Sequence, residues 1–134
     1  MSGLENAAFT IDIGSFGFKY GAESGELVFD ARFLPNPYYI EDLKPLSGMD
    51  KACADYVFGF PAAQKTLLLL KELVLTQAEG FGGHGRTSLK VRIGCTGGRH
   101  RSVALAEALA KEAGAAGYSV SITHRDASRY PSEP

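Results

Sequence analysis

One segment of the chain, residues 89–124, constrains the fold more than any other. Apolar and charged residues alternate over 89–93, a glycine-rich loop and an alanine-rich stretch follow, and apolar alternation returns over 118–122. Alternation with period two predicts a strand, and an alanine-rich stretch between two strands predicts a helix. A strand, a helix and a strand in this order form a right-handed crossover between parallel strands. We therefore expect an α/β domain with a small, mostly parallel sheet flanked by helices.

Two further strands are expected before this segment. Residues 9–13 alternate as a strand, and the sequence GSFGFKYG that follows predicts a loop or a bent strand. A second strand is predicted over residues 27–34, where period two places Asp30 and Arg32 on the same face.

The middle of the chain favours helices. A short helix is predicted over residues 50–58, and a longer one from Pro61 to about Ala78. Apolar residues surround the longer helix on nearly every side, which predicts that it is well buried. Residues 80–88, with the sequence GFGGHGRTS, have the composition of a mobile linker or lid.

The length of 134 residues corresponds to one domain, with a core expected over about residues 9–129 and a frayed tail over 130–134. No apolar run is long enough for a transmembrane helix, and the N-terminus does not resemble a secretory signal, so we expect a cytoplasmic protein without membrane contact. Two cysteines, Cys53 and Cys95, are too few for a disulfide framework or a metal cluster. We expect reduced thiols, no metal and no cofactor.

Basic side chains gather in one stretch of an otherwise acidic chain. Residues 80–106 contain five Lys or Arg and no Asp or Glu, although the formal net charge of the whole chain is −1. Local positive charge favours an anionic ligand such as a phosphate, a sugar phosphate or a nucleic acid, and a solvated surface is the plainer interpretation. The candidate RNA contacts in this stretch are Arg86, Lys90, Arg92 and Arg99.

The glycine-rich loop GCTGGRHRS, residues 94–102, lies within this basic stretch. Ligands of α/β sheets bind beyond the carboxyl ends of the strands, where this loop is expected. Its glycines let backbone N–H groups turn toward one point, and the next helix adds the positive end of its dipole. These features predict a phosphate cradle, and a plain strand-to-helix turn is the alternative. The candidate ligand-binding residues of the loop are Thr96, Gly97, Gly98, Arg99, His100, Arg101 and Ser102.

A catalytic interpretation of the same loop is the runner-up. Cys95 and Arg101 are separated by five residues and Ser102 follows, a spacing that resembles the cysteine-phosphatase signature. In that chemistry a thiolate attacks phosphorus while the arginine holds the phosphoryl oxygens. Asp30 or Asp126 could act as the general acid. We favour the plainer interpretation, in which Cys95 continues the core-facing side of its strand.

Five motifs in a fixed order extend these observations: FGFKYG at 16–21, VFDARFLPNPYY at 28–39, PLSGMD at 45–50, IGCTGGRHRSVALAE at 93–107 and HRD at 124–126. Together they resemble the C-terminal domain of the RapZ family, the RNase adapter proteins of bacteria. The resemblance implies an α/β fold like half of a sugar-phosphate kinase, binding of glucosamine 6-phosphate and of a small regulatory RNA, and assembly into homo-oligomers. The family's N-terminal P-loop domain has no counterpart in this chain, so ATP or GTP binding is not expected here. A separate P-loop chain could be a partner.

The resemblance also assigns ligand contacts, to Asp30, Asn36, Thr96, Gly97 and Arg101. Asp30 suits an ammonium group by its charge, and a salt bridge with Arg32 is its alternative role. Asn36 would contact the sugar, and turn formation between two prolines is its alternative role. Tyr38 stands where some family members have a His, and loss of the imidazole could change the preference for the sugar or remove it.

Three functions follow from these patterns: a sugar-phosphate-binding module that also contacts RNA, a cysteine-dependent phosphatase, and a non-catalytic protein-interaction domain. The first is favoured, so we expect a binding protein rather than an enzyme. For His124, Arg125 and Asp126 we expect a hydrogen-bond cluster at the end of a strand rather than a direct role in the site.

Overall fold

The computed structural model describes residues 8–129, and the tail expected at 130–134 lies outside the described residues. Four strands form one sheet in the order β2-β3-β1-β4, and every neighbouring pair is parallel. The strands are β1 (Thr10–Gly17), β2 (Leu27–Asp30), β3 (Ser88–Cys95) and β4 (Ser119–His124). The predicted α/β class is confirmed, and the sheet is entirely parallel.

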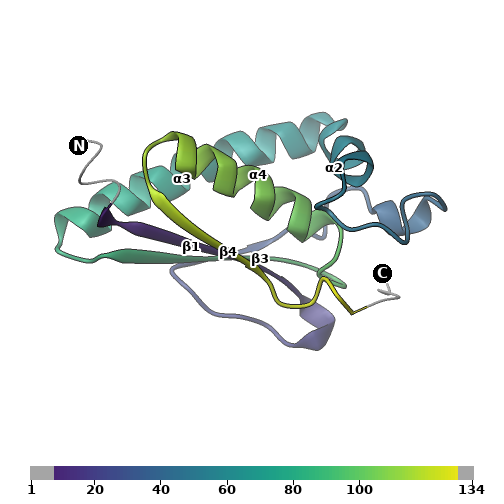
Figure 1. Cartoon of the computed structure of the whole chain (residues 1–134), viewed down its shortest axis with the longest axis horizontal. Helices are drawn as coiled ribbons and strands as arrows, with labels where there is room; N and C mark the ends of the chain where they lie inside the picture. Colours follow the sequence, from purple (N-terminus) through teal and green to yellow (C-terminus); the bar gives the residue numbers. More distant parts are fainter. Residues whose placement is uncertain (1–7, 130–134) are drawn as a thin grey trace.

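Helices cover one face of this sheet (Figure 1). They are α2 (Lys51–Phe58), α3 (Pro61–Gly83) and α4 (Arg101–Ala115), and two short 3-10 helices, η1 (Phe18–Tyr20) and η2 (Pro37–Tyr39), follow β1 and β2. Parallel strands need long crossovers, which α3 provides between β2 and β3 and α4 between β3 and β4. None of the helices described combines the length and the apolar character that a membrane span requires.

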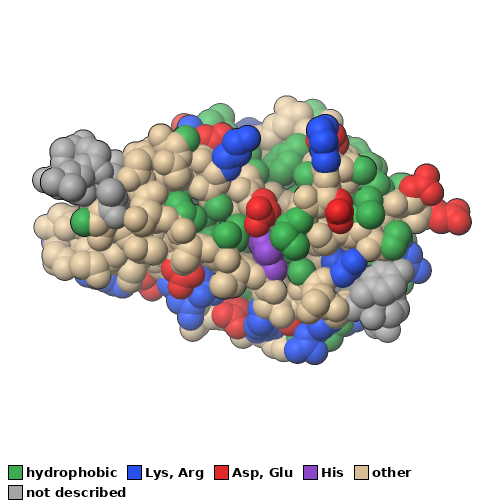
Figure 2. Space-filling view, viewed as in Figure 1, with side chains coloured by type: hydrophobic (Ala, Val, Ile, Leu, Met, Phe, Trp, Pro, Cys, Tyr) green, Lys and Arg blue, Asp and Glu red, His purple; other side chains and the backbone are tan. Residues whose placement is uncertain are grey.

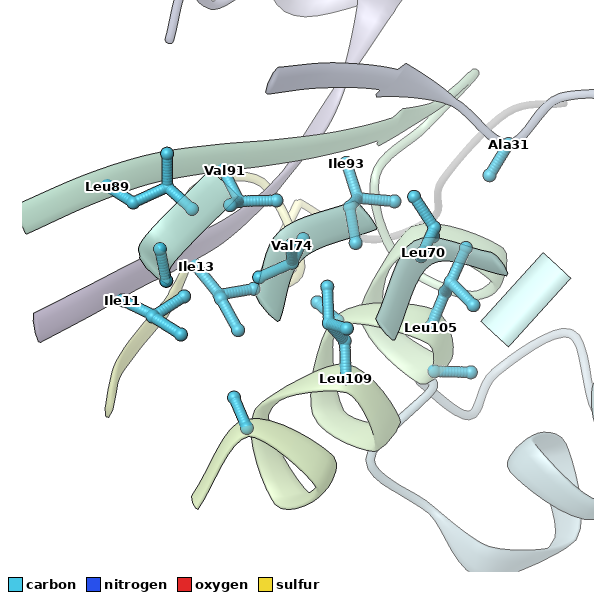
Figure 3. Packing of buried hydrophobic residues seen from close by; sticks show 14 of the residues in the cluster. Ile11, Ile13, Ala31, Leu70, Val74, Leu89, Val91, Ile93, Leu105 and Leu109 are labelled. Atoms are coloured by element: carbon cyan, nitrogen blue, oxygen red, sulfur yellow. The ribbon is translucent and has the colours of Figure 1, made fainter. Parts of the chain in front are cut away.

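The core lies between the sheet and the helices (Figure 3). Ile11 and Ile13 on β1 and Val91 on β3 belong to the same buried cluster as Val74 on α3 and Leu109 on α4. All five side chains are at most 1% exposed. Burial at this level contributes roughly 1.5–3 kcal/mol for each large aliphatic side chain, so the alternation along β1 and β3 decides which face the helices cover.

The opposite face of the sheet carries charged side chains, because Asp12, Lys90 and Arg92 alternate with the core residues along β1 and β3. The segment between η1 and β2 runs along this side (Figure 1). Its Glu23 carboxylate lies 3.4 Å from Nε of Arg92, and its Glu26 carboxylate accepts a hydrogen bond of 3.0 Å from the backbone N–H of Lys90. An acidic segment therefore covers part of the basic face.

The structure decides between the alternatives for one strand boundary and corrects another. β1 continues through Gly17, so the first half of GSFGFKYG extends the strand, one of the two alternatives predicted for it. β2 ends at Asp30 instead of continuing to residue 34. The reason is local, because the Asp30 carboxylate accepts a hydrogen bond of 2.9 Å from the backbone N–H of Arg32 and turns the chain out of the sheet.

The predictions for α3 also need correction. The helix extends to Gly83 instead of ending near Ala78, so most of the expected linker over residues 80–88 is helical or part of β3. The helix is also not buried all round, since Leu68, Leu69 and Leu73 are 54%, 53% and 44% exposed. Helices cover the sheet in a single layer, so only one side of α3 finds a partner in the described domain.

The substitution Gly80→Ala tests the extension of α3. Gly80 lies inside the helix, and a Cβ there would meet no atom within 4 Å. Alanine should therefore raise the free energy of unfolding by about 0.4–1 kcal/mol, measured by urea denaturation. Gly85→Ala is the control, because Gly85 has a φ of +82° and alanine there should destabilise. A neutral or destabilising Gly80→Ala would show that the helix ends earlier.

Candidate functional site

Close packing between backbones holds the loop of residues 96–100 at the carboxyl edge of the sheet. Gly98 has a φ of +74°, and a side chain there would overlap the backbones of Phe16 and Gly17. On its other side, the backbone N–H of Gly48 donates a 2.9 Å hydrogen bond to the carbonyl oxygen of Arg99, and a Cβ at Gly48 would overlap the start of α4. Glycine is required at these positions because two backbones meet there.

Most backbone N–H groups in and just after this loop lack protein acceptors. Among residues 8–129, the N–H groups that donate to no acceptor include those of Thr96, Gly97, Gly98, His100 and Arg101. The N–H of Ser102, in the first turn of α4, reaches only the Cys95 sulfur at 3.4 Å. Buried backbone N–H groups are nearly always paired, and an anion at a helix N-terminus is a common partner for such groups.

Arg99 and His100 anchor the loop to carbonyl oxygens. Nε and Nη2 of Arg99 donate to the carbonyls of Leu46 and Pro45 at 2.9 and 2.6 Å. Nε2 of His100 lies 3.0 Å from the carbonyl oxygen of Lys44. Burial lowers the pKa of His100, so the imidazole is neutral near pH 7, and Nε2 carries its proton because a carbonyl can only accept. Both side chains thus hold the loop against residues 44–46.

Arg101 is buried, with 5% of its surface exposed, and its guanidinium is only partly paired. Nη1 donates to the carbonyl oxygens of Arg32 at 2.8 Å and Leu34 at 3.1 Å, whereas Nε has no hydrogen-bond partner. Leaving a buried donor unpaired costs about 1–3 kcal/mol. An acceptor brought by a ligand would relieve this cost.

Cys95 is buried as the core-facing interpretation predicted, with 2% of its surface exposed. Its thiol donates to Oγ of Ser102 at 3.1 Å, and its sulfur accepts the weaker contact from the backbone of the same residue. The Arg101 guanidinium, the other half of the proposed phosphatase pair, binds backbone carbonyls instead. The second cysteine, Cys53, is also buried, and burial raises the pKa of its thiol to about 11.

Asp30 and Asn36 both have intramolecular partners. Arg32 donates three side-chain hydrogen bonds to the Asp30 carboxylate, at 2.6–3.1 Å, and the nearby charges of Arg32 and Arg101 help to lower the pKa of Asp30. Oδ1 of Asn36 accepts a 3.1 Å hydrogen bond from the backbone N–H of Tyr38 at the start of η2. The salt bridge and the turn are therefore both present, and ligand contact by these residues stays a prediction.

Two of the four candidate RNA contacts form ion pairs with acidic residues. Arg86 pairs with Glu26 at 3.0 Å, and Arg92 pairs with Asp12 at 3.2 Å as well as with Glu23. Acidic and basic side chains are likewise interspersed on the face shown in Figure 2. The positive field expected from residues 80–106 is thus reduced by carboxylates from residues 12–26.

The sequence HRD, residues 124–126, forms the expected cluster at the end of β4. Asp126 is fully buried and accepts hydrogen bonds from the backbone N–H of Gly17 (2.8 Å), from Arg125 (2.8 Å) and from Arg129 (2.9 Å). Burial acts to raise the pKa of Asp126, but hydrogen bonds from Arg125, Gly17 and Arg129 lower it overall. An ionised carboxylate of this kind is poorly suited to the general-acid role considered for Asp126.

These contacts bring the ends of three strands to the loop that contains the unpaired N–H groups. The sequence motifs that form these contacts also occur in known proteins. A family model described as the RapZ C-terminal domain matches residues 9–128. The chain belongs to this family. Curated relatives named as nucleotide-binding proteins come from Bacillus cytotoxicus (48% identical over 120 residues), Lactobacillus helveticus (46% over 123) and Finegoldia magna (49% over 117).

The matches to these relatives cover 89%, 91% and 87% of this chain, but only 41%, 42% and 41% of the respective relatives. The chain therefore spans about two fifths of their length. The expected resemblance to RapZ C-terminal domains is confirmed.

Contacts of three residues in this RapZ-type domain, Ser15, Glu107 and Arg32, were not predicted from the sequence. Oγ of Ser15 lies 2.6 Å from Nδ1 of His124, and Nε2 of that histidine lies 2.7 Å from Glu107. Arg32, considered only as a partner of Asp30, also stacks on Phe18. Ser15 had a detectable signal, because it is a polar residue on the core-facing side of β1. No group of His, Cys, Asp and Glu side chains within residues 8–129 is arranged to hold a metal ion.

The substitution Gly98→Ala tests the close packing of the loop in this RapZ-type domain. A positive φ and the overlap with Gly17 both oppose a side chain, so we expect a loss of at least about 1 kcal/mol in the free energy of unfolding. Gly114→Ala in α4 is the matched control, because a Cβ there meets nothing within 4 Å and alanine favours a helix. Equal unfolding midpoints for the two variants in urea would contradict the packing described.

Proposed function

We propose that this RapZ-type domain binds a phosphorylated amino sugar, such as glucosamine 6-phosphate, at the loop of residues 96–102. The observation that carries the proposal is the set of loop N–H groups without acceptors next to the unpaired Nε of Arg101. A phosphate ester brings several anionic oxygens that accept such hydrogen bonds, and the N-terminus of α4 favours negative charge at the same place.

Asp30 is the proposed partner of the sugar's amino group. It pairs with Gly94 across β2 and β3, one residue before Cys95 and two before the loop. Its side chain is 48% exposed, and the hydrogen bonds from Arg32 lower the pKa of its carboxyl, so the group is ionised at neutral pH. An ionised carboxylate near a phosphate cradle suits a ligand that carries an ammonium group as well as a phosphate.

Asn36 is the proposed partner of the sugar hydroxyls. Its Oδ1 is used in the turn with Tyr38, so the side-chain amide Nδ2 is the group that would donate to a ligand.

RNA contact is the second part of the proposal, through Arg86, Lys90, Arg92 and Arg99. The support is the basic stretch of the sequence together with membership of the RapZ family. Arg86 and Arg92 would have to exchange carboxylates for RNA phosphates, and Arg99 would have to leave the carbonyls that it binds. We therefore expect weak binding that depends strongly on salt and contributes no sequence readout.

The relatives of this chain extend well beyond the part that it matches, and they are named nucleotide-binding proteins. The proposal therefore includes a nucleotide-binding module as a functional partner, in the same polypeptide or in a separate chain. It also includes self-association. No nucleotide site is assigned to residues 8–129.

Isothermal titration calorimetry tests the ligand. Glucosamine 6-phosphate should bind the wild-type protein with a Kd on the order of 10 μM, which corresponds to about 7 kcal/mol. Arg101→Ala should weaken binding at least about tenfold, because a charge-assisted hydrogen bond is lost. Lys111→Ala, an exposed change on the same helix, should bind as the wild type does. Equal affinity of Arg101→Ala and wild type would reject the site, and no binding to the wild type would reject the ligand.

Filter binding over a salt series tests the RNA contact. A generic RNA should bind at low salt and dissociate as salt rises, because phosphate contacts release counterions. Lys90→Ala should reduce the slope of log Kobs against log salt concentration by about 1. Lys51→Ala removes a lysine from α2, outside the basic stretch, and should leave the slope unchanged. Binding that is absent at low salt, or that does not respond to salt, would contradict this part of the proposal.

A further inference from the structure

Both oxygens of the Asp30 carboxylate are engaged by one residue, Arg32. Nε of Arg32 lies 2.9 and 3.1 Å from the two carboxylate oxygens, Nη2 lies 2.6 Å from one of them, and the backbone N–H of the same residue donates at 2.9 Å. A carboxylate has about four lone-pair sites, and three N–H groups of Arg32 occupy most of them, including the two-pronged position that best suits a second cation. Any ammonium group that binds Asp30 must therefore displace the Arg32 guanidinium.

Arg32 is well placed for such an exchange, because both members of the pair are half exposed, at 47% and 48% of the side-chain surface. The Arg32 guanidinium also lies 4.0 Å from the centroid of the Phe18 ring. Stacking of this kind would keep the guanidinium beside the site after it leaves Asp30, because an aromatic face attracts a cation.

Phe18 and Arg101 link Arg32 to the loop. The Phe18 ring packs so closely on Gly94 that a Cβ there would lie 2.6 Å from Cε2 of the ring. The backbone carbonyl of Arg32 accepts the hydrogen bond from Nη1 of Arg101. The Asp30–Arg32 pair therefore borders the loop of unpaired N–H groups through both its side chain and its backbone.

We propose that Arg32 is an internal competitor for the amino group of the ligand, and that this competition sets the selectivity of the site. This inference rests on the proposed function. A ligand that is only anionic, such as inorganic phosphate or glucose 6-phosphate, can bind the loop and leave the Asp30–Arg32 pair intact. A ligand with an ammonium group and a phosphate exchanges its ammonium for the guanidinium at Asp30.

Calorimetry with glucosamine 6-phosphate, glucose 6-phosphate and inorganic phosphate tests the competition. The measured quantity is the preference ratio, defined as the Kd of glucose 6-phosphate divided by the Kd of glucosamine 6-phosphate. Arg32→Gln should raise this ratio about fivefold, the change that corresponds to ~1 kcal/mol for a well-formed exposed ion pair. Asp30→Asn should bring the ratio close to one. Arg32→Lys, which keeps the charge but not the two-pronged contact, should lie between Arg32→Gln and the wild type.

Lys51→Gln is the matched control. It removes the cation from another exposed pair, Lys51–Asp55 at 2.6 Å on α2, and should leave the ratio at the wild-type value. A ratio that does not change in Arg32→Gln would overturn the competition. So would an equal weakening of both sugar phosphates in that variant, because Arg32 would then serve the phosphate alone. If the wild type binds none of the three probes, the proposed function fails and this inference falls with it, a result distinct from binding with an unchanged ratio.

Discussion

The packing of one backbone directly on another is the constraint on which the site depends. The loop of residues 96–100 lies between Gly17, at the end of β1, and Gly48, which precedes α2, and no side chain fits at either contact. The backbone N–H groups of Thr96, Gly97, Gly98, His100 and Arg101 donate to no acceptor within residues 8–129. Close packing thus fixes the position of a loop that contains a set of unpaired donors.

Most of the charged side chains around the loop stabilise the structure through contacts within the protein. Arg99 and His100 bind the carbonyls of residues 44–46, and the buried Asp126 holds the end of β1 through the N–H of Gly17. Among the charged side chains around the loop in residues 8–129, Arg101 has a buried donor without a partner, and the Asp30–Arg32 pair is half exposed. The site proposed here is therefore narrower than the full set of cationic residues in the loop.

Much of the fold could be predicted because each strand shows a local sequence pattern, the alternation of apolar and polar residues. The alternation of Leu89, Val91 and Ile93 requires one covered face, and burial of that face against α3 and α4 follows. The end of β2 could not be predicted from alternation, because a hydrogen bond from the Arg32 backbone to Asp30 turns the chain. The length of α3 was also missed, since glycines such as Gly80 lower helix propensity yet are tolerated within a helix that packs on the sheet.

The sequence by itself determined the α/β class, the family, the glycine-rich loop before α4 and the burial of Cys95, because each depends on local spacing or on a motif. Only the tertiary structure decided what the charges do. Arg86 and Arg92 meet acidic residues about 60 to 80 positions away, and Arg101 reaches carbonyls of the segment after β2. The attraction between two charged groups depends on their distance in space and not on their separation along the chain. A parallel sheet brings together strand ends that are far apart along the chain.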